Sequence, residues 1–112
     1  MVKILAVDVN GETLKTACNN LTNSFKAQGS SRITKITPYV CVLSTSENVD
    51  KLFDEALKTF GDIDIFIANA GFAYYELIST PDWTHMEKIY RVNVFSSIYI
   101  IEKMQAIHGD RP

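Results

Sequence analysis

The sequence IDIFIANAG, residues 63–71, decides the fold class of this chain. Residues 63–68 are mostly apolar and combine β-branched, aromatic and small side chains. Such a short apolar run predicts a strand that is covered on both faces, as the strands of parallel sheets are. The turn at residues 69–71 follows at once, so the stretch predicts a buried strand that ends in a turn of small residues.

Two strand–helix units precede this strand. The first begins with a nearly continuous apolar run at residues 2–9, which predicts a second buried strand. Asn10 is a candidate N-cap for the helix that follows, and apolar residues recur at helical spacing until Gly29. The second unit has a predicted strand at residues 37–43 and then an amphipathic helix that ends at Gly61.

A long helix follows the strand at residues 63–68. Thr80 and Pro81 form an N-cap followed by proline at the first helical position, and the helix is predicted to run from residue 81 to about 107, before Gly109. It is apolar nearly all round, which is typical of a helix that is buried on more than one side. Since a sheet of three strands covers one face only, we expect a partner chain or a further segment to cover the other.

The resulting order, βαβαβα, predicts an α/β fold of three layers, with a Rossmann-like parallel sheet between helices. The chain has 112 residues, of which 46% are hydrophobic and 21% charged, and this composition fits one globular domain. A net charge of −2 without a cluster of Lys or Arg argues against nucleic-acid binding. No apolar stretch is long enough to span a membrane. Cys18 and Cys41 fit buried, reduced thiols, so we expect a cytoplasmic protein.

Polar groups end two of the predicted strands, where ligands of open parallel sheets bind. Asp8 ends the first strand. A carboxylate there accepts hydrogen bonds from both hydroxyls of an adenosine ribose and repels a 2′-phosphate, but helix capping or a turn explains this acid as well. After Asn69, the small residues Ala70 and Gly71 allow a flat ligand to approach the backbone, although a tight turn explains Gly71 equally well.

Residues 60–71, FGDIDIFIANAG, resemble the signature of the short-chain dehydrogenase/reductase family, in which a strand runs into Asn-Asn-Ala-Gly. Ala68 stands at the first Asn of that signature. Downstream, Trp83 and Val92-Asn93-Val94 resemble the long helix of the family, and Val7-Asp8-Val9 resembles its second strand with the ribose-binding acid. The resemblance implies that residues 1–112 form a partial Rossmann-type dinucleotide-binding domain. It also implies an oxidoreductase with an unknown small-molecule substrate that uses NAD in preference to NADP.

The resemblance also assigns roles to individual residues. Asp8, Asn69, Ala70 and Gly71 are the expected cofactor-binding residues. Asn93 is the expected catalytic residue, because the Asn of the family at this position bonds the backbone and holds a water of the proton relay. The alternative for Asn93 is a buried side chain that satisfies a helix irregularity. No residue is expected to bind a metal.

Several parts of the family pattern lie outside these 112 residues. The first strand and the Thr-Gly-x-x-x-Gly-x-Gly loop, which holds the pyrophosphate, would precede Met1, and the catalytic serine and the Tyr-x-x-x-Lys helix would follow Pro112. We therefore expect an internal fragment that transfers no hydride by itself. Since a strand of the family would lie between residues 2–9 and 63–68, we expect these two strands to pair directly, in the order second–first–third. Val42 stands where the family has an acid near the adenine.

Three features imitate functional motifs. Tyr99 and Lys103 have the catalytic spacing of the family, but they lie on the same helix as Asn93, whereas a whole strand separates the two positions in the family. We interpret them as a Tyr with a Lys packed beside it. His85 and His108 lack a partner acid or cysteine at ligand spacing and are expected at the surface. The pair at residues 74–75, both Tyr, either stacks on a base or packs within its loop.

Two other functions are considered beside an NAD-linked oxidoreductase. The first is a non-catalytic binding or assembly module, which would form an oligomer or join a longer relative through the helix at residues 81–108. The second is a signalling receiver domain, which has a similar length and element order. However, Val9 stands where receivers carry a second acid, and Asn69 rather than Asp follows the third strand. No carboxylate cluster for magnesium is therefore expected.

Overall fold

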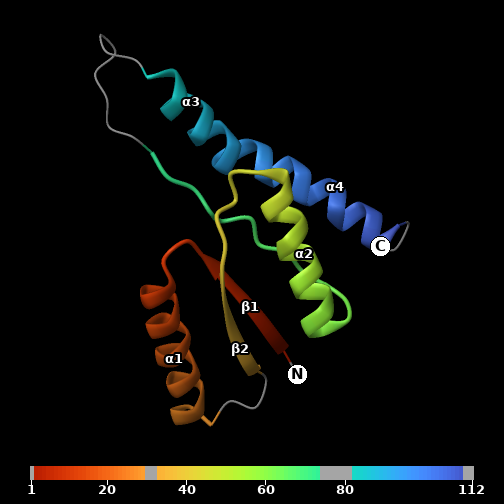
Figure 1. Ribbon diagram of the computed structural model, residues 1–112. Helices are drawn as coiled ribbons and strands as arrows, with labels where there is room; N and C mark the ends of the chain where they lie inside the picture. Colours follow the sequence, from red (N-terminus) through yellow and green to blue (C-terminus); the bar gives the residue numbers. More distant parts are fainter. Residues whose placement is uncertain (1, 30–32, 74–81, 110–112) are drawn as a thin grey trace. The chain divides into compact units, whose positions relative to one another are not determined.

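The computed structural model describes residues 2–29, 33–73 and 82–109 (Figure 1). The chain divides into two compact units, Met1–Val42 and Leu43–Pro112. Each unit is built from its own helices and turns, and the parallel sheet belongs to the first.

The first unit is a β–α–β motif. Strand β1 (Val2–Asp8) is followed by helix α1 (Gly11–Ala27) and strand β2 (Ile33–Val40). The two strands pair in parallel, and the N–H of Cys41 donates to the carbonyl of Asp8 at 2.9 Å just beyond the end of β2. The α/β class and the parallel pairing of the first two strands are thereby confirmed.

Helix α1 begins as its sequence predicts. The side-chain oxygen of Asn10 accepts a hydrogen bond from the N–H of Thr13 at 3.1 Å, so Asn10 is the N-cap. At the other end Gly29 has a φ of +67°, a conformation that glycine adopts without steric cost. Leu14 and Cys18 are buried on the side of α1 that packs against the strands.

Strand β2 lies earlier in the chain than predicted, at Ile33–Val40 instead of residues 37–43. The prediction placed Pro38 near the entrance of the strand, whereas the structure holds it inside, opposite Ala6 of β1. A strand with one bonded neighbour tolerates proline where the missing N–H does not face that neighbour. The buried Leu43, which the prediction placed in the strand, belongs to the second unit.

The regular elements described in the second unit are helices. They are α2 (Ser46–Phe60), α3 (Trp83–Tyr90), the π-helical turn η1 (Arg91–Phe95) and α4 (Ser96–His108). Figure 1 shows α3 and α4 as parts of one long rod. Helix α2 packs against α4.

The boundaries of α2 have clear physical causes. The hydroxyl of Thr45 accepts a hydrogen bond from the N–H of Asn48 at 3.2 Å and caps the start of the helix. Gly61, with a φ of +82°, ends it as predicted, and its N–H donates to the carbonyl of Leu57 at 2.7 Å. Among its described residues, the buried apolar ones of the second unit are Leu43, Val49, Leu52, Phe53, Ala56, Ile63, Val92 and Ile100.

The predicted helix at residues 81–107 differs from the observed one at two points. Thr80 and Pro81 lie outside the described residues, and the helix begins at Trp83, because an Asp82 oxygen accepts hydrogen bonds from two N–H groups of its first turn. The helix is also interrupted by η1, which hydrophobic periodicity alone does not reveal.

The prediction of a strand at residues 63–68 is wrong. Among the described residues the sheet contains two strands, β1 and β2, so the expected order second–first–third does not form. A parallel strand requires covered faces and a bonded neighbour. The structure leaves Ile65 and Ile67 79% and 81% exposed, so the apolar run is not covered in the way the prediction assumed.

The prediction of buried thiols is confirmed. Cys18 and Cys41 are both buried thiols. Helix α4 carries exposed apolar side chains in addition to its buried ones, among them Ile98 and Ile101. Among the described residues, no helix has both the length and the apolar character needed to cross a bilayer.

Candidate functional site

Asp8 is the last residue of β1, and its side chain is exposed. One carboxylate oxygen, Oδ1, accepts a hydrogen bond from the N–H of Val9 at 2.7 Å, which fixes the orientation of the carboxylate. Helix α1 is capped by Asn10, so Asp8 is not its N-cap. Helix capping therefore does not explain this acid.

A depression lies beside Asp8, between the start of α1 and the end of β2. Its lining residues are Val9, Asn10, Gly11, Glu12, Lys15, Pro38 and Val40. A Cβ at Gly11 would lie 3.3 Å from Cγ2 of Val40, so the helix start and the strand approach closely here. The apolar parts of this lining suit a flat ring, and the N-terminus of a helix favours negative charge.

Asn93 lies in η1 and binds the backbone just after the turn at residues 69–71. Its Nδ2 donates to the carbonyl of Phe72 at 2.8 Å, and its Oδ1 accepts from the N–H of Phe72 at 3.0 Å. The side chain is exposed, so the expected alternative of a buried Asn is wrong, although Asn93 does lie in a helix irregularity. The Asn93 amide is therefore hydrogen-bonded to both the N–H and the carbonyl of Phe72.

The close approach of Asn93 favours glycine at position 71. A Cβ at Gly71 would lie 3.3 Å from Oδ1 and 3.6 Å from Cγ of Asn93. The φ of Gly71 is not positive, so a left-handed turn does not explain this glycine. Asn69 and Ala70, which precede it, are exposed. The structure therefore brings Gly71 and Asn93 together, while a shared edge with Asp8 stays a prediction.

Tyr99 and Lys103 bind Asp50 of α2. Tyr99 Oη donates to Asp50 Oδ1 at 2.8 Å, and Lys103 Nζ donates to the same oxygen at 2.5 Å. The Lys103 hydrogen bond holds the pKa of Asp50 below its usual range, and the bonds to Asp50 raise the pKa values of Tyr99 and Lys103. A Tyr that acts as an acid–base group near neutral pH needs a lowered pKa, whereas that of Tyr99 is raised. The contacts of Tyr99 and Lys103 with Asp50 instead join α4 to α2.

Asp50 was not predicted as the partner of this pair. Phe72 was not predicted either; the centroid of its ring lies 5.7 Å from Lys88 Nζ, and its main chain is bonded by Asn93. The signal for Asp50 lies in the spacing of Tyr99 and Lys103, since residues four apart on a helix reach the same point.

The two histidines differ in their surroundings. His85 Nε2 lies 3.8 Å from an oxygen of the N-cap Asp82. Both histidines are half-buried rather than at the surface. His108 Nε2 contacts the carbonyl oxygen of Ile63 and lies 3.9 Å from an oxygen of Asp62. Over the described parts of the chain, no three His, Cys, Asp or Glu side chains gather as metal ligands would. Tyr74 and Tyr75 lie outside the described residues.

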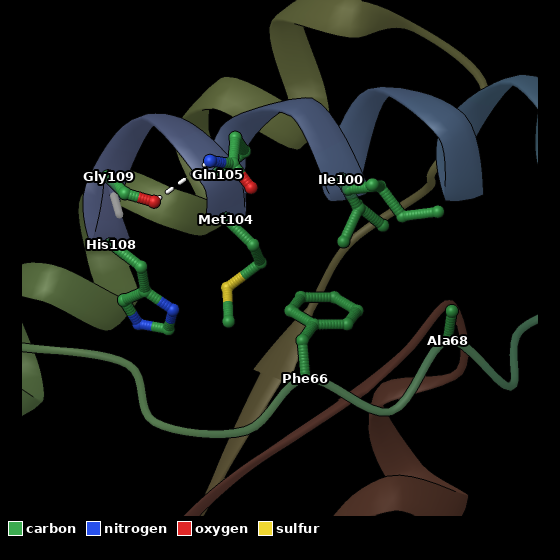
Figure 2. A pocket seen from close by; sticks show the side chains of 8 residues that line it. Phe66, Ala68, Ile100, Met104, Gln105, His108 and Gly109 are labelled. Carbon is green, nitrogen blue, oxygen red and sulfur yellow. Dashed lines mark hydrogen bonds between the residues drawn. The ribbon is translucent and has the colours of Figure 1, made fainter. Parts of the chain in front are cut away.

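An apolar hollow of about 380 Å³ lies between α4 and the segment at residues 63–68. Figure 2 shows Met104 and His108 pointing from the helix toward this segment, with Phe66 facing them. The ring of Phe66 stacks on Phe53 of α2, with 5.6 Å between the ring centroids. The hollow is lined mainly by apolar side chains, and its Gln105 Nε2 donates to the carbonyl of Gly109 at 2.8 Å.

Known proteins match this chain in sequence and in fold. The NADH-dependent L-xylulose reductase of Ambrosiozyma monospora is 30% identical over 70 residues, which are 61% of this chain and 25% of that enzyme. A metagenomic short-chain oxidoreductase in complex with NADP superposes with a TM-score of 0.78 at 16% identity, over 95% of this chain and 45% of that one. NAD+-bound xylitol dehydrogenase superposes with a TM-score of 0.71 at 22% identity, over 94% and 38%.

The L-sorbose reductase of Gluconobacter frateurii, complexed with NADPH and L-sorbose, has a TM-score of 0.74 at 21% identity, over 95% of this chain and 39% of that one. The solved structures show the fold, and this chain spans less than half of each. The family described as short chain dehydrogenase matches residues 2–107. Because that match covers nearly the whole sequence, the chain belongs to the short-chain dehydrogenase family.

Proposed function

We propose that this chain forms part of the cofactor face of an NAD-dependent short-chain dehydrogenase, with Asp8 as the acceptor for the adenosine ribose. The observation that carries the proposal is the exposed carboxylate of Asp8 at the carboxyl end of β1. Asn10 caps the helix, and the N–H of Val9 orients the carboxylate, so the acid is held in place for a ligand hydroxyl.

The charge of Asp8 supports NAD rather than NADP. A carboxylate accepts hydrogen bonds from ribose hydroxyls but repels a 2′-phosphate. Glu12, which lines the neighbouring depression, adds a second negative charge, whereas Lys15 on the same lining is positive. The relatives described above include proteins bound to NAD+ and proteins bound to NADP or NADPH, so the preference is argued from the residues of this chain.

Asn69, Ala70 and Gly71 are the proposed contacts for the rest of the dinucleotide, and Asn93 is the proposed catalytic residue. By holding both main-chain groups of Phe72, Asn93 fixes the backbone that follows Gly71. When bound, NAD would supply the hydride acceptor. The residues of this chain would orient it, and small side chains at 70 and 71 would let it approach the backbone.

We further propose that the 112 residues by themselves transfer no hydride. The Tyr with the family spacing is bonded to Asp50, which raises the pKa of Tyr99 and thereby disfavours its role as a proton acceptor. Oxidation of NADH by the purified chain with a panel of small ketones and ketoses would contradict this part of the proposal.

The cofactor proposal is tested by titrating the 15N-labelled chain with NADH and with NADPH. We expect amide shifts that centre on residues 8–12 and are larger for NADH. Asp8→Asn should abolish the difference between the two nucleotides, and Asp64→Asn, a matched change at an exposed acid elsewhere, should leave it unchanged. Absence of shifts at residues 8–12 with millimolar NADH would contradict the proposal.

A second function, a non-catalytic assembly module, is supported by the exposed apolar side chains of η1 and α4. Phe95, Ile98 and Ile101 are 58%, 54% and 67% exposed. Exposed apolar side chains that lie close together mark association surfaces. Light scattering separates this function from the first, since association through these side chains predicts a mass above 12.6 kDa that falls to the monomer value in Ile98→Ser.

A further inference from the structure

The turn that carries Asn93 has the hydrogen-bond pattern of a π-helix in place of that of an α-helix. In a regular α-helix the N–H of Ser96 would donate to the carbonyl of Val92, four residues earlier. Here it donates to the carbonyl of Arg91, five residues earlier, as in a π-helix. The side chain of Ser96 makes the bond that its main chain does not, because Oγ donates to the carbonyl of Val92 at 2.5 Å.

This replacement takes place where water has little access. Ser96 is 5% exposed and Val92 is 8% exposed. A buried carbonyl that loses a donor is unfavourable, so a hydroxyl at this point stabilises the wide turn relative to a regular helix. Single π-turns within α-helices occur frequently at functional sites.

The wide turn determines the direction of the Asn93 side chain. An added residue in a helical turn rotates the residues on one side of it by roughly 100° relative to those on the other. On one side of this turn, Ile100 and Tyr99 hold α4 in the core and against α2. Within the turn, Asn93 reaches the main chain of Phe72.

We propose that Ser96 is a positioning residue for Asn93. Its hydroxyl stabilises η1, and η1 directs the Asn93 amide to both main-chain groups of Phe72. Without the hydroxyl, the N–H of Ser96 returns to the carbonyl of Val92, the turn becomes α-helical, and Asn93 rotates away from Phe72. The catalytic meaning of this link rests on the proposed function, but the link itself is measured without any cofactor, so the two can fail separately.

The test compares three variants of the full 15N-labelled chain: Ser96→Ala, Ser96→Thr and Ser97→Ala. In Ser96→Ala we expect the exchange of the Phe72 amide proton to rise about fivefold, as for the loss of one hydrogen bond. The side-chain amide resonances of Asn93 should move toward those of a solvated Asn. Exchange at Gly61, whose N–H bonds Leu57 in α2, should rise by a smaller factor.

Ser96→Thr keeps a hydroxyl at the same atom position and should retain wild-type exchange at Phe72. Ser97→Ala is the same substitution one residue later and should also behave as wild type. Unchanged Phe72 exchange and Asn93 resonances in Ser96→Ala would overturn the proposal, as would an equal change in Ser97→Ala or a failure of Ser96→Thr to retain them.

If Ser96→Ala does not fold, the proposal is tested on the wild-type chain and on Ser96→Thr. Couplings across hydrogen bonds identify which carbonyl accepts from the N–H of Ser96. A coupling to the carbonyl carbon of Arg91 in both the wild type and Ser96→Thr supports the proposal, and a coupling to that of Val92 overturns it.

Discussion

The side-chain amide of Asn93 pairs with both main-chain groups of Phe72, donating to its carbonyl at 2.8 Å and accepting from its N–H at 3.0 Å. The two residues lie 21 positions apart in the sequence. This pairing connects the turn at residues 69–71 to the helix that follows, and it joins two sequence motifs that the family resemblance assigned to the same site.

Loss of this pairing should weaken the fold measurably. Asn93→Ala removes two hydrogen bonds and should lower the free energy of unfolding by about 1–2 kcal/mol. Urea denaturation of both chains measures the change. The matched control is Asn20→Ala on the exposed side of α1, which should stay within about 0.5 kcal/mol of the wild type. An equal effect of the two substitutions would show that the pairing contributes nothing.

Gly71 should couple energetically to Asn93. Gly71→Ala places a Cβ 3.3 Å from Asn93 Oδ1 and should destabilise the chain by about 1 kcal/mol. In the Asn93→Ala background this cost should disappear, because the obstructing atom is gone. Gly61→Ala has open space around its Cβ but a φ of +82°, so its cost should persist in both backgrounds. A double-mutant cycle that shows additivity for Gly71 and Asn93 would contradict the assignment.

The core of the second unit depends on Phe53. Its side chain is 1% exposed and stacks on Phe66 with 5.6 Å between the ring centroids. Phe53→Ala should therefore cost about 3–5 kcal/mol of unfolding free energy. Phe95→Ala, the same change at a position that is 58% exposed, should cost less than about 0.5 kcal/mol. Comparable denaturation midpoints for the two variants would refute this placement of the core.

The Asp50 cluster predicts a dependence of stability on pH at both extremes. The pKa of Asp50 is lowered in the folded chain, chiefly by its bond to Lys103, so its stabilising contribution is complete above the unfolded pKa of about 3.9 and is lost as pH falls through the folded pKa. The pKa values of Tyr99 and Lys103 are raised, so their contributions are complete below about pH 10 and are lost as pH rises through the folded values.

Asp50→Asn should flatten both limbs of the stability profile. Tyr99→Phe should flatten part of each limb, because the Tyr99 hydrogen bond also lowers the pKa of Asp50. Denaturation at a series of pH values measures each profile. Asp54→Asn serves as a control on the same helix, because Asp54 acts on Lys103 only through space. A wild-type profile in Asp50→Asn would contradict the role of the cluster.

Much of the first unit is predictable from local signals. The apolar run of β1, the cap at Asn10 and the glycine at the end of α1 depend on neighbours within a few residues, and the structure confirms them. The same holds for α2, which Thr45 and Gly61 delimit. Hydrophobic periodicity and capping chemistry suffice where each element carries its own signals.

The parts of the fold and of the candidate site that were not predicted depend on contacts between residues that are distant in sequence. The run at residues 63–68 has the composition of a strand, but a strand forms through neighbours that composition does not provide. The π-turn depends on one buried hydroxyl at Ser96, which looks like any helical serine in sequence. Asp50 was missed because its role requires that α2 and α4 lie side by side.

Asp8 and the turn at residues 69–71 are proposed to bind one dinucleotide, so they should lie close together. A nitroxide attached at Ala70→Cys, with the buried Cys18 and Cys41 left in place, tests this through paramagnetic broadening in the 15N-labelled chain. We expect strong broadening of the Val9 and Asn10 amides, beside Asp8, and relief of that broadening after reduction of the label. Sharp Val9 and Asn10 signals in the presence of the oxidised label would contradict it.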